Sequence, residues 1–485
     1  MVNRVYLRVG IFSPLVLVFW ALLAVGVILS RGAMAAGSES PESLYNQGLA
    51  YELGKGVDKN PLKAAEFYER AASLGNLSAA YNLGLLYLGG AGVAQDYAKA
   101  RLYFSRAAEK DHAPSLYNIA LLYDSGLGVE SDSSAAVQWY TKAANQGHLL
   151  SQYILGLRYA SGTGVAANDG VSFKWMRKAA DQGHANAAFL VGVAFEQGRG
   201  VTADPNRALE YWRQAAEKKD SSAIATLGWA YQNGIGTPPD LEKAGYWYRQ
   251  SAELGNPTAY YNLGLLYQTG KYGAIGGKPN LAEMVKNFRR AADLGHSLAQ
   301  NLLGVLYSTD GSGVVRDFKQ AAQWFSKSAE QGQAQAQYNL ANLYRFGNGV
   351  ELNRNRAISL YRAAAEQSEV NAENALGWLY ATGEFTERNP EQAVLWLRRA
   401  ASRGDEIALY NLGVLFGSGD LIPRNNGYSL TYLTLAARSG NSKAELARQV
   451  VESFASEQER LDAEKIVQQW KPGKQLPGAN LLNSP

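Results

Sequence analysis

The chain of 485 residues contains no cysteine. It therefore forms no disulfide, no thiolate metal site and no thiol nucleophile, and lipoprotein anchoring through an N-terminal cysteine is excluded. A large charge of one sign is also missing, because 47 basic and 43 acidic residues leave a formal net charge of +4. Arg4, Arg8 and Arg31 supply most of this excess, and no block of like charge follows them. Proteins that bind nucleic acid usually carry a clustered basic surface, so this class is excluded.

Long apolar runs are absent except at the N-terminus. Arg4 and Arg8 precede an uncharged, largely apolar run from Val9 to Leu29, which as a helix would span about 31 Å, enough for the core of a bilayer. Ala33-Met34-Ala35 has the small-x-small pattern of a signal cleavage site. Residues 1–35 are thus either a cleaved signal peptide or a single N-terminal membrane anchor, and both interpretations stay open.

The basic residues before this run predict that the remainder of the chain lies across the membrane from the cytoplasm. We therefore expect an exported protein of the periplasm, either soluble or tethered to the inner membrane with its repeats on the outer side. Membrane contact is expected only through residues 9–29, if that segment is retained.

One small residue returns at a fixed spacing through most of the chain. A glycine, or an alanine in its place, recurs every 36 residues, with two wider gaps of 40 and 37. The positions are Gly48, Gly84, Ala120, Gly156, Gly192, Gly228, Gly264, Gly304, Ala341, Gly377 and Gly413. A period in this range is typical of a solenoid of stacked helix pairs, in which each unit contacts mainly its neighbours. The spacing predicts an all-α solenoid of eleven helix-turn-helix repeats over residues 36–440.

The second repeat illustrates the pattern within one unit. Leu83 and Tyr87 share one helix face, and Gly84 lies between them. A glycine inside a helix costs about 1 kcal/mol relative to alanine, so its return indicates close contact with a second helix. Gly90-Ala91-Gly92-Val93 forms the loop, and Asp96 is the expected N-cap of the second helix. The equivalent caps are Asn60, Asp132, Asn168, Asp204, Asp240, Asn280, Asp317, Asn353, Asn389 and Asn425.

Two features depart from this frame. The loop from Gly270 to Pro279 is longer than its equivalents, so we predict a surface protrusion and a candidate contact site there. Residues 441–470 keep a helical pattern without the glycine signature, and Ser456 with Glu459 makes a capping box. They are interpreted as C-terminal capping helices that cover the last apolar face, followed by a flexible tail at residues 471–485.

The unit that contains Tyr81-Asn82-Leu83-Gly84, the loop Gly-x-Gly-Val, the cap Asp96, an aromatic pair and Ala-Ala-x-x-Gly resembles the Sel1-like repeat, a sub-class of the tetratricopeptide superfamily. The resemblance covers about Pro41 to Gly440, with local departures at Lys219, Ser368, Glu384-Phe385 and Ser418. It implies right-handed superhelical stacking and a role as an adaptor in multiprotein complexes. Exported bacterial members are implicated in envelope assembly, exopolysaccharide secretion, signalling and host-cell contact.

Residues that could carry chemistry are few. His112, His148, His184 and His296 each follow the end of a second helix, so we interpret them as loop or cap residues. Packed helices lie 8–10 Å apart, too far for equivalent histidines of neighbouring repeats to share one metal ion. The run from Gly273 to Lys278 lacks the spacing of a phosphate-binding loop. The sequence therefore predicts no enzyme, no cofactor and no metal site.

By the same resemblance, the first helix of each pair lines a concave surface on which partners bind. The tyrosines and asparagines that precede the repeated glycine form a ladder there: Tyr81, Asn82, Tyr117, Asn118, Tyr153, Tyr261, Asn262, Tyr338, Asn339, Tyr410 and Asn411. Arg158, Trp229, Arg345 and Trp378 replace the residues that are common at their positions. Two interpretations stay open, because these side chains either contact a partner or pack and hydrogen-bond between neighbouring helices.

Together these features predict a non-enzymatic scaffold that binds protein partners in the bacterial periplasm or cell envelope through its concave surface. The alternative is a polysaccharide-binding component of exopolysaccharide secretion or envelope assembly. Nucleic acid is not expected as a partner.

Overall fold

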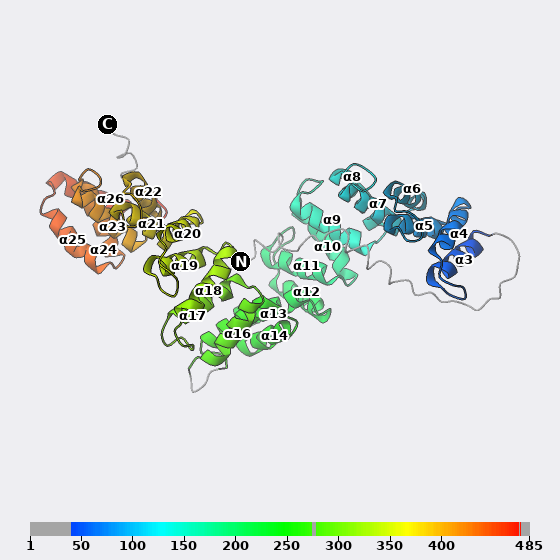
Figure 1. The fold of residues 1–485 in the computed structure, drawn as a ribbon, viewed down its shortest axis with the longest axis horizontal. Helices are drawn as coiled ribbons and strands as arrows, with labels where there is room; N and C mark the ends of the chain where they lie inside the picture. Colours follow the sequence, from blue (N-terminus) through cyan, green and yellow to red (C-terminus); the bar gives the residue numbers. More distant parts are fainter. Residues whose placement is uncertain (1–39, 274–277, 475, 477–485) are drawn as a thin grey trace. The chain divides into compact units, whose positions relative to one another are not determined.

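The computed structural model describes residues 40–273, 278–474 and 476, and every element of regular secondary structure there is an α-helix. Both interpretations of the N-terminal segment concern residues outside this part of the chain. None of the helices in the described ranges is long and apolar enough to cross a membrane. The helices fall into two compact units, which meet in the chain between Asp240 and Leu241, and in Figure 1 the helices of each unit follow one another in chain order.

The first unit contains α3 (Pro41–Leu53), α4 (Pro61–Ser73), α5 (Leu77–Gly89), α6 (Tyr97–Ala108), α7 (Ala113–Ser125), α8 (Ser133–Asn145), α9 (Leu149–Ser161), α10 (Asp169–Asp181), α11 (Ala185–Gln197), α12 (Pro205–Glu217) and α13 (Ser221–Asn233). The second unit contains α14 (Leu241–Glu253), α15 (Pro257–Gln268), α16 (Leu281–Asp293), α17 (Ser297–Ser308), α18 (Phe318–Glu330), α19 (Ala334–Phe346), α20 (Arg354–Glu366), α21 (Val370–Thr382), α22 (Pro390–Ser402), α23 (Glu406–Ser418), α24 (Asn426–Arg438), α25 (Ser442–Glu452) and α26 (Glu457–Gln469). Odd-numbered helices from α3 to α23 are the first helices of the eleven repeats, and even-numbered helices from α4 to α24 are the second helices.

Within each unit, a first helix packs on the second helix of its own repeat, which in turn packs on the next first helix. The repeated glycine lies where the two helices of one repeat meet. A Cβ atom added at Gly84 would lie 2.6 Å from the Phe104 ring, and one at Gly264 would lie 2.5 Å from Phe288. Ala120 and Ala341 occupy this site in two repeats and are fully buried. The close helix contact predicted from the glycine spacing is confirmed.

The predicted N-caps of ten second helices are also confirmed. In α4, α6, α8, α10, α12, α16, α18, α20, α22 and α24, the aspartate or asparagine before the helix accepts a hydrogen bond from the first turn. For example, the Asp96 carboxylate accepts from the Lys99 amide at 2.9 Å. These bonds satisfy N–H groups that have no partner within the helix.

The long loop of the seventh repeat is tied down where it leaves α15. Tyr272 is only 2% exposed, and its ring fills the space that a side chain at Gly245 of α14 would need, since a Cβ there would lie 2.3 Å from it. The Tyr272 hydroxyl also accepts a hydrogen bond from Arg249. The predicted surface protrusion therefore begins with an anchored residue, while residues 274–277 lie outside the described part.

At the C-terminus, α25 and α26 both pack on α24, and the capping box of Ser456 and Glu459 is present at the start of α26. The residues directly after α26 differ from the predicted flexible tail. The Gly473 amide donates to the Ser402 carbonyl at 2.7 Å, and Arg398 donates to the Leu476 carbonyl at 2.6 Å. Leu476 is 3% exposed. The described residues beyond Trp470 are thus held against α22, because an apolar side chain near the chain end finds a buried site there.

Candidate functional site

Most tyrosines of the predicted ladder contact aromatic or histidine rings of neighbouring elements. The Tyr81 ring centre is 5.8 Å from that of Phe104 in its own second helix and 5.0 Å from that of His112, which begins the next repeat. Tyr117 contacts Tyr140 and His148 in the same way, and Tyr261 contacts Phe288 and His296. Tyr153 stacks on His184 at 4.2 Å, and Tyr338 contacts Tyr361 at 5.9 Å. Burial raises the pKa of Tyr117 to about 12. The contacts of Tyr81, Tyr117, Tyr153 and Tyr261 with the histidines join one repeat to the next.

Two asparagines of the ladder join neighbouring first helices by hydrogen bonds. The Asn339 side chain donates to Asn301 of the preceding first helix at 3.0 Å, and Asn411 donates to Asn374 at 3.0 Å. Asn301 and Asn374 stand where other repeats have the ladder tyrosine. Asn118 instead donates to the Pro114 carbonyl of its own helix at 2.9 Å. For Asn339 and Asn411 the structure shows the interaction between helices that the sequence left open, and the contact of all these asparagines with a partner stays a prediction.

Arg158 and Arg345 are both held by carboxylates of a neighbouring repeat. Arg158 pairs with Asp124 in α7, while Arg345 makes a two-pronged contact with Glu384, at 3.0 Å from Nε to Oε1 and 2.6 Å from Nη2 to Oε2. The Arg158 and Arg345 side chains are 19% and 16% exposed. Their charges are therefore neutralised within the chain, and their geometry serves inter-repeat contact.

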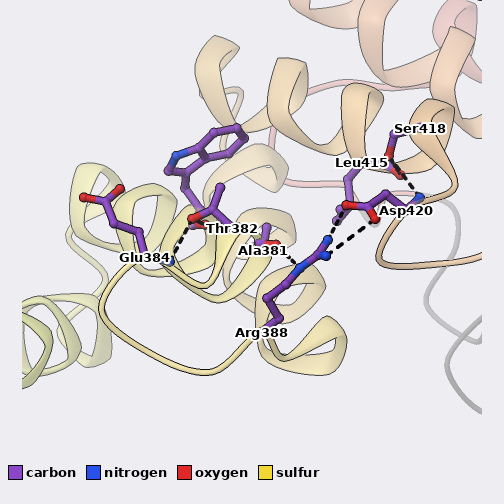
Figure 2. A network of polar contacts seen from close by, with 8 residues as sticks. Ala381, Thr382, Glu384, Arg388, Leu415, Ser418 and Asp420 are labelled. Carbon is purple, nitrogen blue, oxygen red and sulfur yellow. Dashed lines mark hydrogen bonds and ion pairs between the residues drawn. The ribbon is translucent and has the colours of Figure 1, made fainter.

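A similar ion pair joins the loops of the tenth and eleventh repeats. Figure 2 shows Arg388 reaching from the loop after α21 toward Asp420 in the loop after α23. The Arg388 Nε also donates to the Ala381 carbonyl at 3.1 Å, which fixes the direction of the side chain. The pair of Arg345 and Glu384 links α19 to the loop after α21, and the pair of Arg388 and Asp420 links that loop to the loop after α23.

The two predicted tryptophans differ in environment, although they occupy the same position of the repeat. Trp229 in α13 is partly buried and lies edge-on to Trp212, with ring centres 6.3 Å apart. Trp378 in α21 is 37% exposed. Trp378 is therefore the more accessible of the two side chains.

Two exposed apolar residues on the first helices of the second unit escaped the sequence reasoning. Phe346 in α19 is 59% exposed and Ile407 in α23 is 47% exposed. Each replaces a residue that is mostly small or polar in the other repeats, as Thr382 and Asn371 are in the tenth. This contrast within the repeat was visible in the sequence and could have identified them. Large exposed apolar side chains on neighbouring helices are a common feature of protein-binding surfaces.

The four histidines are confirmed as N-cap residues of first helices. His148 Nδ1 accepts from the Ser151 amide at 3.3 Å, and His184 Nδ1 accepts from the Ala187 amide at 3.2 Å. Burial lowers the pKa of His148 to about 4, with a smaller contribution from the charge of His112. Burial also lowers the pKa values of His112 and His184. Such groups couple the stability of the first unit to pH.

We expect the first unit to lose stability as the pH falls from about 6.5 toward 4. In this window the unfolded chain binds protons at these histidines and the folded chain does not, so acid favours unfolding. The contribution of His148 reaches about 2 kcal/mol at pH 5. Asparagine caps the equivalent helices at Asn76 and Asn256, so a variant with His112→Asn, His148→Asn and His184→Asn keeps the caps without the titration. Between pH 7 and pH 5 the melting temperature should fall less in this variant than in the wild type. Equal falls would contradict the assignment of this pH dependence to the three histidines.

The packed helix pairs, the fixed glycine contact and the inter-repeat contacts define an α-solenoid repeat protein. The model of the Sel1 repeat matches eleven consecutive segments, at residues 41–76, 77–112, 113–148, 149–184, 185–220, 221–256, 257–296, 297–333, 334–369, 370–405 and 407–441. The chain belongs to the Sel1 repeat family, and the family predicted from the residues is confirmed.

Two solved structures are similar over most of the chain. One is c5321, a protective antigen of uropathogenic Escherichia coli strains, with 30% identity over 89% of this chain and 91% of that chain and a TM-score of 0.66. The other is a Sel1 repeat protein from Oxalobacter formigenes, with 29% identity over 75% of this chain and 99% of that chain and a TM-score of 0.56. No curated protein matches the chain in sequence. Sel1 repeat proteins typically mediate protein–protein interaction, as non-catalytic scaffolds.

Proposed function

We propose that the protein is a non-enzymatic scaffold that binds a protein partner through the first helices of its second unit. The observation that supports this most strongly is the exposure of Trp378, Phe346 and Ile407 on neighbouring first helices. Tryptophan contributes more binding energy than most residue types when a partner covers it. The surrounding ion pairs and inter-helix hydrogen bonds hold the surface in shape before binding, which lowers the entropy that binding costs.

We further propose that this scaffold acts outside the cytoplasm, in the periplasm or on the envelope. The basic residues Arg4 and Arg8 before the apolar run of residues 9–29 support export. The similar Escherichia coli protein is a protective antigen, which agrees with a location outside the cytoplasm. The mass of the N-terminal peptide of the native protein tests the export step, since a start at Ala36 indicates a cleaved signal.

Site-specific cross-linking tests the partner surface. A photoreactive phenylalanine analogue at position 378 should capture a protein partner in intact cells, because this side chain is open to solvent. The matched control carries the analogue at Trp324, a second-helix tryptophan that is covered by Lys327 at 4.3 Å. We expect adducts at position 378 that are absent at 324, and a Trp378→Ala substitution should weaken capture of the same partner.

Other outcomes would change the assignment. Equal adducts at both positions would place the contact elsewhere. Retention of the protein on envelope polysaccharide, with no protein adduct at position 378, would favour the polysaccharide-binding alternative.

A further inference from the structure

One face of the first helices shares an unusual composition. Relative to the repeated glycine, the positions six before, two before, one after and five after lie on a single face, because their spacings of four, three and four residues match the helical period. In α21 these are Asn371, Ala375, Trp378 and Thr382. We call these four positions of each first helix the first-helix stripe.

The stripe is almost without charge. Over the eleven repeats, Glu42 is the only charged residue at these positions, although charged residues make up 19% of the chain. In the second unit the stripe consists of Thr258, Asn262, Leu265, Thr269, Leu298, Leu302, Val305, Thr309, Gln335, Asn339, Asn342, Phe346, Asn371, Ala375, Trp378, Thr382, Ile407, Asn411, Val414 and Ser418. Solvent-facing helix positions usually include lysine, glutamate or arginine, so the composition is not that of an ordinary surface.

Burial does not explain the missing charges. In the second unit every residue of the stripe except Asn411 is at least partly exposed. The second helices of the same repeats carry charges on their exposed positions, as Arg354, Arg356 and Glu366 do in α20. The restriction to uncharged residues is therefore specific to the first helices, where a partner is proposed to bind.

Two arginines close to the stripe in the chain are neutralised by carboxylates. Arg345 contacts Glu384, and Arg388 contacts Asp420 (Figure 2). A charged partner would lose water on this surface and meet no opposite charge at the positions of the stripe itself, which is unfavourable. An uncharged partner avoids this cost.

We infer that the stripe of α17, α19, α21 and α23 binds an extended polypeptide segment that has apolar side chains and no charged ones. This inference rests on the proposed function and names the chemistry of the partner. The exposed side chains of Val305, Phe346, Trp378 and Ile407 would contact the apolar side chains of the segment. Amides such as Asn371 and Gln335 carry both donors and acceptors, as the peptide backbone does.

The spacing of the helices suits an extended chain. First helices α21 and α23 contact each other directly, and the hydrogen bond from Asn411 to Asn374 crosses between them. Packed helices lie about 8–10 Å apart, and an extended chain advances about 3.3 Å per residue. In a segment that runs across the first helices, roughly every third residue would thus lie over the stripe of one helix. The exposed set includes the aliphatic side chains of Val305 and Ile407, which favours a polypeptide over a glycan that stacks on aromatic rings.

Binding of peptide pools to the purified full-length protein tests this. Three random pools of equal length and equal apolar content, one acidic, one neutral and one basic, are passed over the immobilised protein. We expect preferential retention of the neutral pool, with less than about a twofold change between 50 and 500 mM NaCl, because salt screens only charge interactions. Trp378→Lys and Thr382→Asp should each weaken retention of the neutral pool about tenfold. Trp324→Lys, on the second helix α18, should leave it unchanged, and thermal melting checks that all variants fold.

Preferential retention of the acidic or basic pool would overturn the inference. A tenfold loss of neutral-pool retention in high salt would do so too, as would retention of neutral dextran while no peptide pool is retained. Trp378→Lys without effect on the neutral pool would do the same. If no pool is retained while position 378 cross-links to a protein in cells, the inference on charge fails and the scaffold function stands. If position 378 captures no protein either, the scaffold function fails with it.

Discussion

Substituting Arg399→Ala and Arg403→Ala together should destabilise the second unit by about 3–5 kcal/mol, the usual cost of breaking a buried ion pair. The reason is Glu373 in α21, whose carboxylate is completely buried. Arg403 pairs with its Oε2, and the Arg399 Nε lies 3.0 Å from its Oε1 without hydrogen-bond alignment. Both arginines are partly exposed, so their removal leaves a buried negative charge with no cation beside it.

The chain itself supplies the control for this substitution. Three other repeats have a buried glutamine at the position of Glu373, and it accepts from a second glutamine at the position of Arg403: Gln152 with Gln182, Gln300 with Gln331 and Gln337 with Gln367, at 2.6, 2.7 and 2.8 Å. Ala363 stands at the position of Arg399 in the last of these repeats. A variant with Glu373→Gln, Arg399→Ala and Arg403→Gln therefore rebuilds an arrangement that the fold already accommodates.

We expect this rebuilt variant to lose about 1 kcal/mol or less, since an uncharged amide pair needs no counter-ion. Urea unfolding followed by circular dichroism compares it with the double alanine variant and the wild type. If the rebuilt variant is as unstable as the double alanine variant, the loss comes from the arginine side chains themselves and not from the buried charge.

The sequence was sufficient for the frame of each repeat because this frame depends on local and periodic signals. The glycine spacing predicted the helix pairs, and the aspartate or asparagine before each second helix predicted where it begins. Both depend on contacts within a few residues or at a constant offset along the chain. The capping box of Ser456 and Glu459 is local in the same sense.

The roles of single departures from the repeat could not be predicted in this way. Arg158 departs from the common residue at its position, which suggested a free binding group. Its partner is Asp124, 34 residues earlier in the neighbouring repeat. Trp229 and Trp378 occupy the same position of the repeat. Their environments differ because Trp212 packs against Trp229. Such pairings depend on which faces of neighbouring repeats meet, and one sequence does not specify that.

The loop Gly-x-Gly-Val contains a second requirement that the sequence did not reveal. Its second glycine adopts a left-handed backbone angle, with a φ of 70° at Gly200. In addition, a Cβ atom at Gly200 would lie 2.1 Å from the carbonyl oxygen of Asp169, at the start of the preceding second helix α10. The glycine is thus needed both for its φ and for the close approach of two repeats.

We expect Gly200→Ala to destabilise the first unit by about 3 kcal/mol, because about 1 kcal/mol of backbone strain is added to the cost of moving the loop away from α10. Gly147→Ala is the matched control. Gly147 has a φ of 83°, but nothing lies within 4 Å of its added Cβ, and Asp111, Lys219 and Ser368 adopt the same left-handed angles at the equivalent site. This substitution should therefore cost only about 1 kcal/mol.

Urea unfolding of both variants, with hydrogen exchange of the first turn of α10, measures the difference. Faster exchange there in Gly200→Ala alone would show that the loop has separated from the preceding repeat. In the tenth repeat Phe385 stands at the position of Gly200, with a φ of 70°, and the Arg354 guanidinium lies 5.1 Å from its ring centre. A side chain is therefore accommodated where the preceding second helix offers it a contact. At Gly200 the neighbouring atoms are backbone and cannot rotate away. Equal losses in the two alanine variants would mean that backbone angle alone selects glycine in these loops.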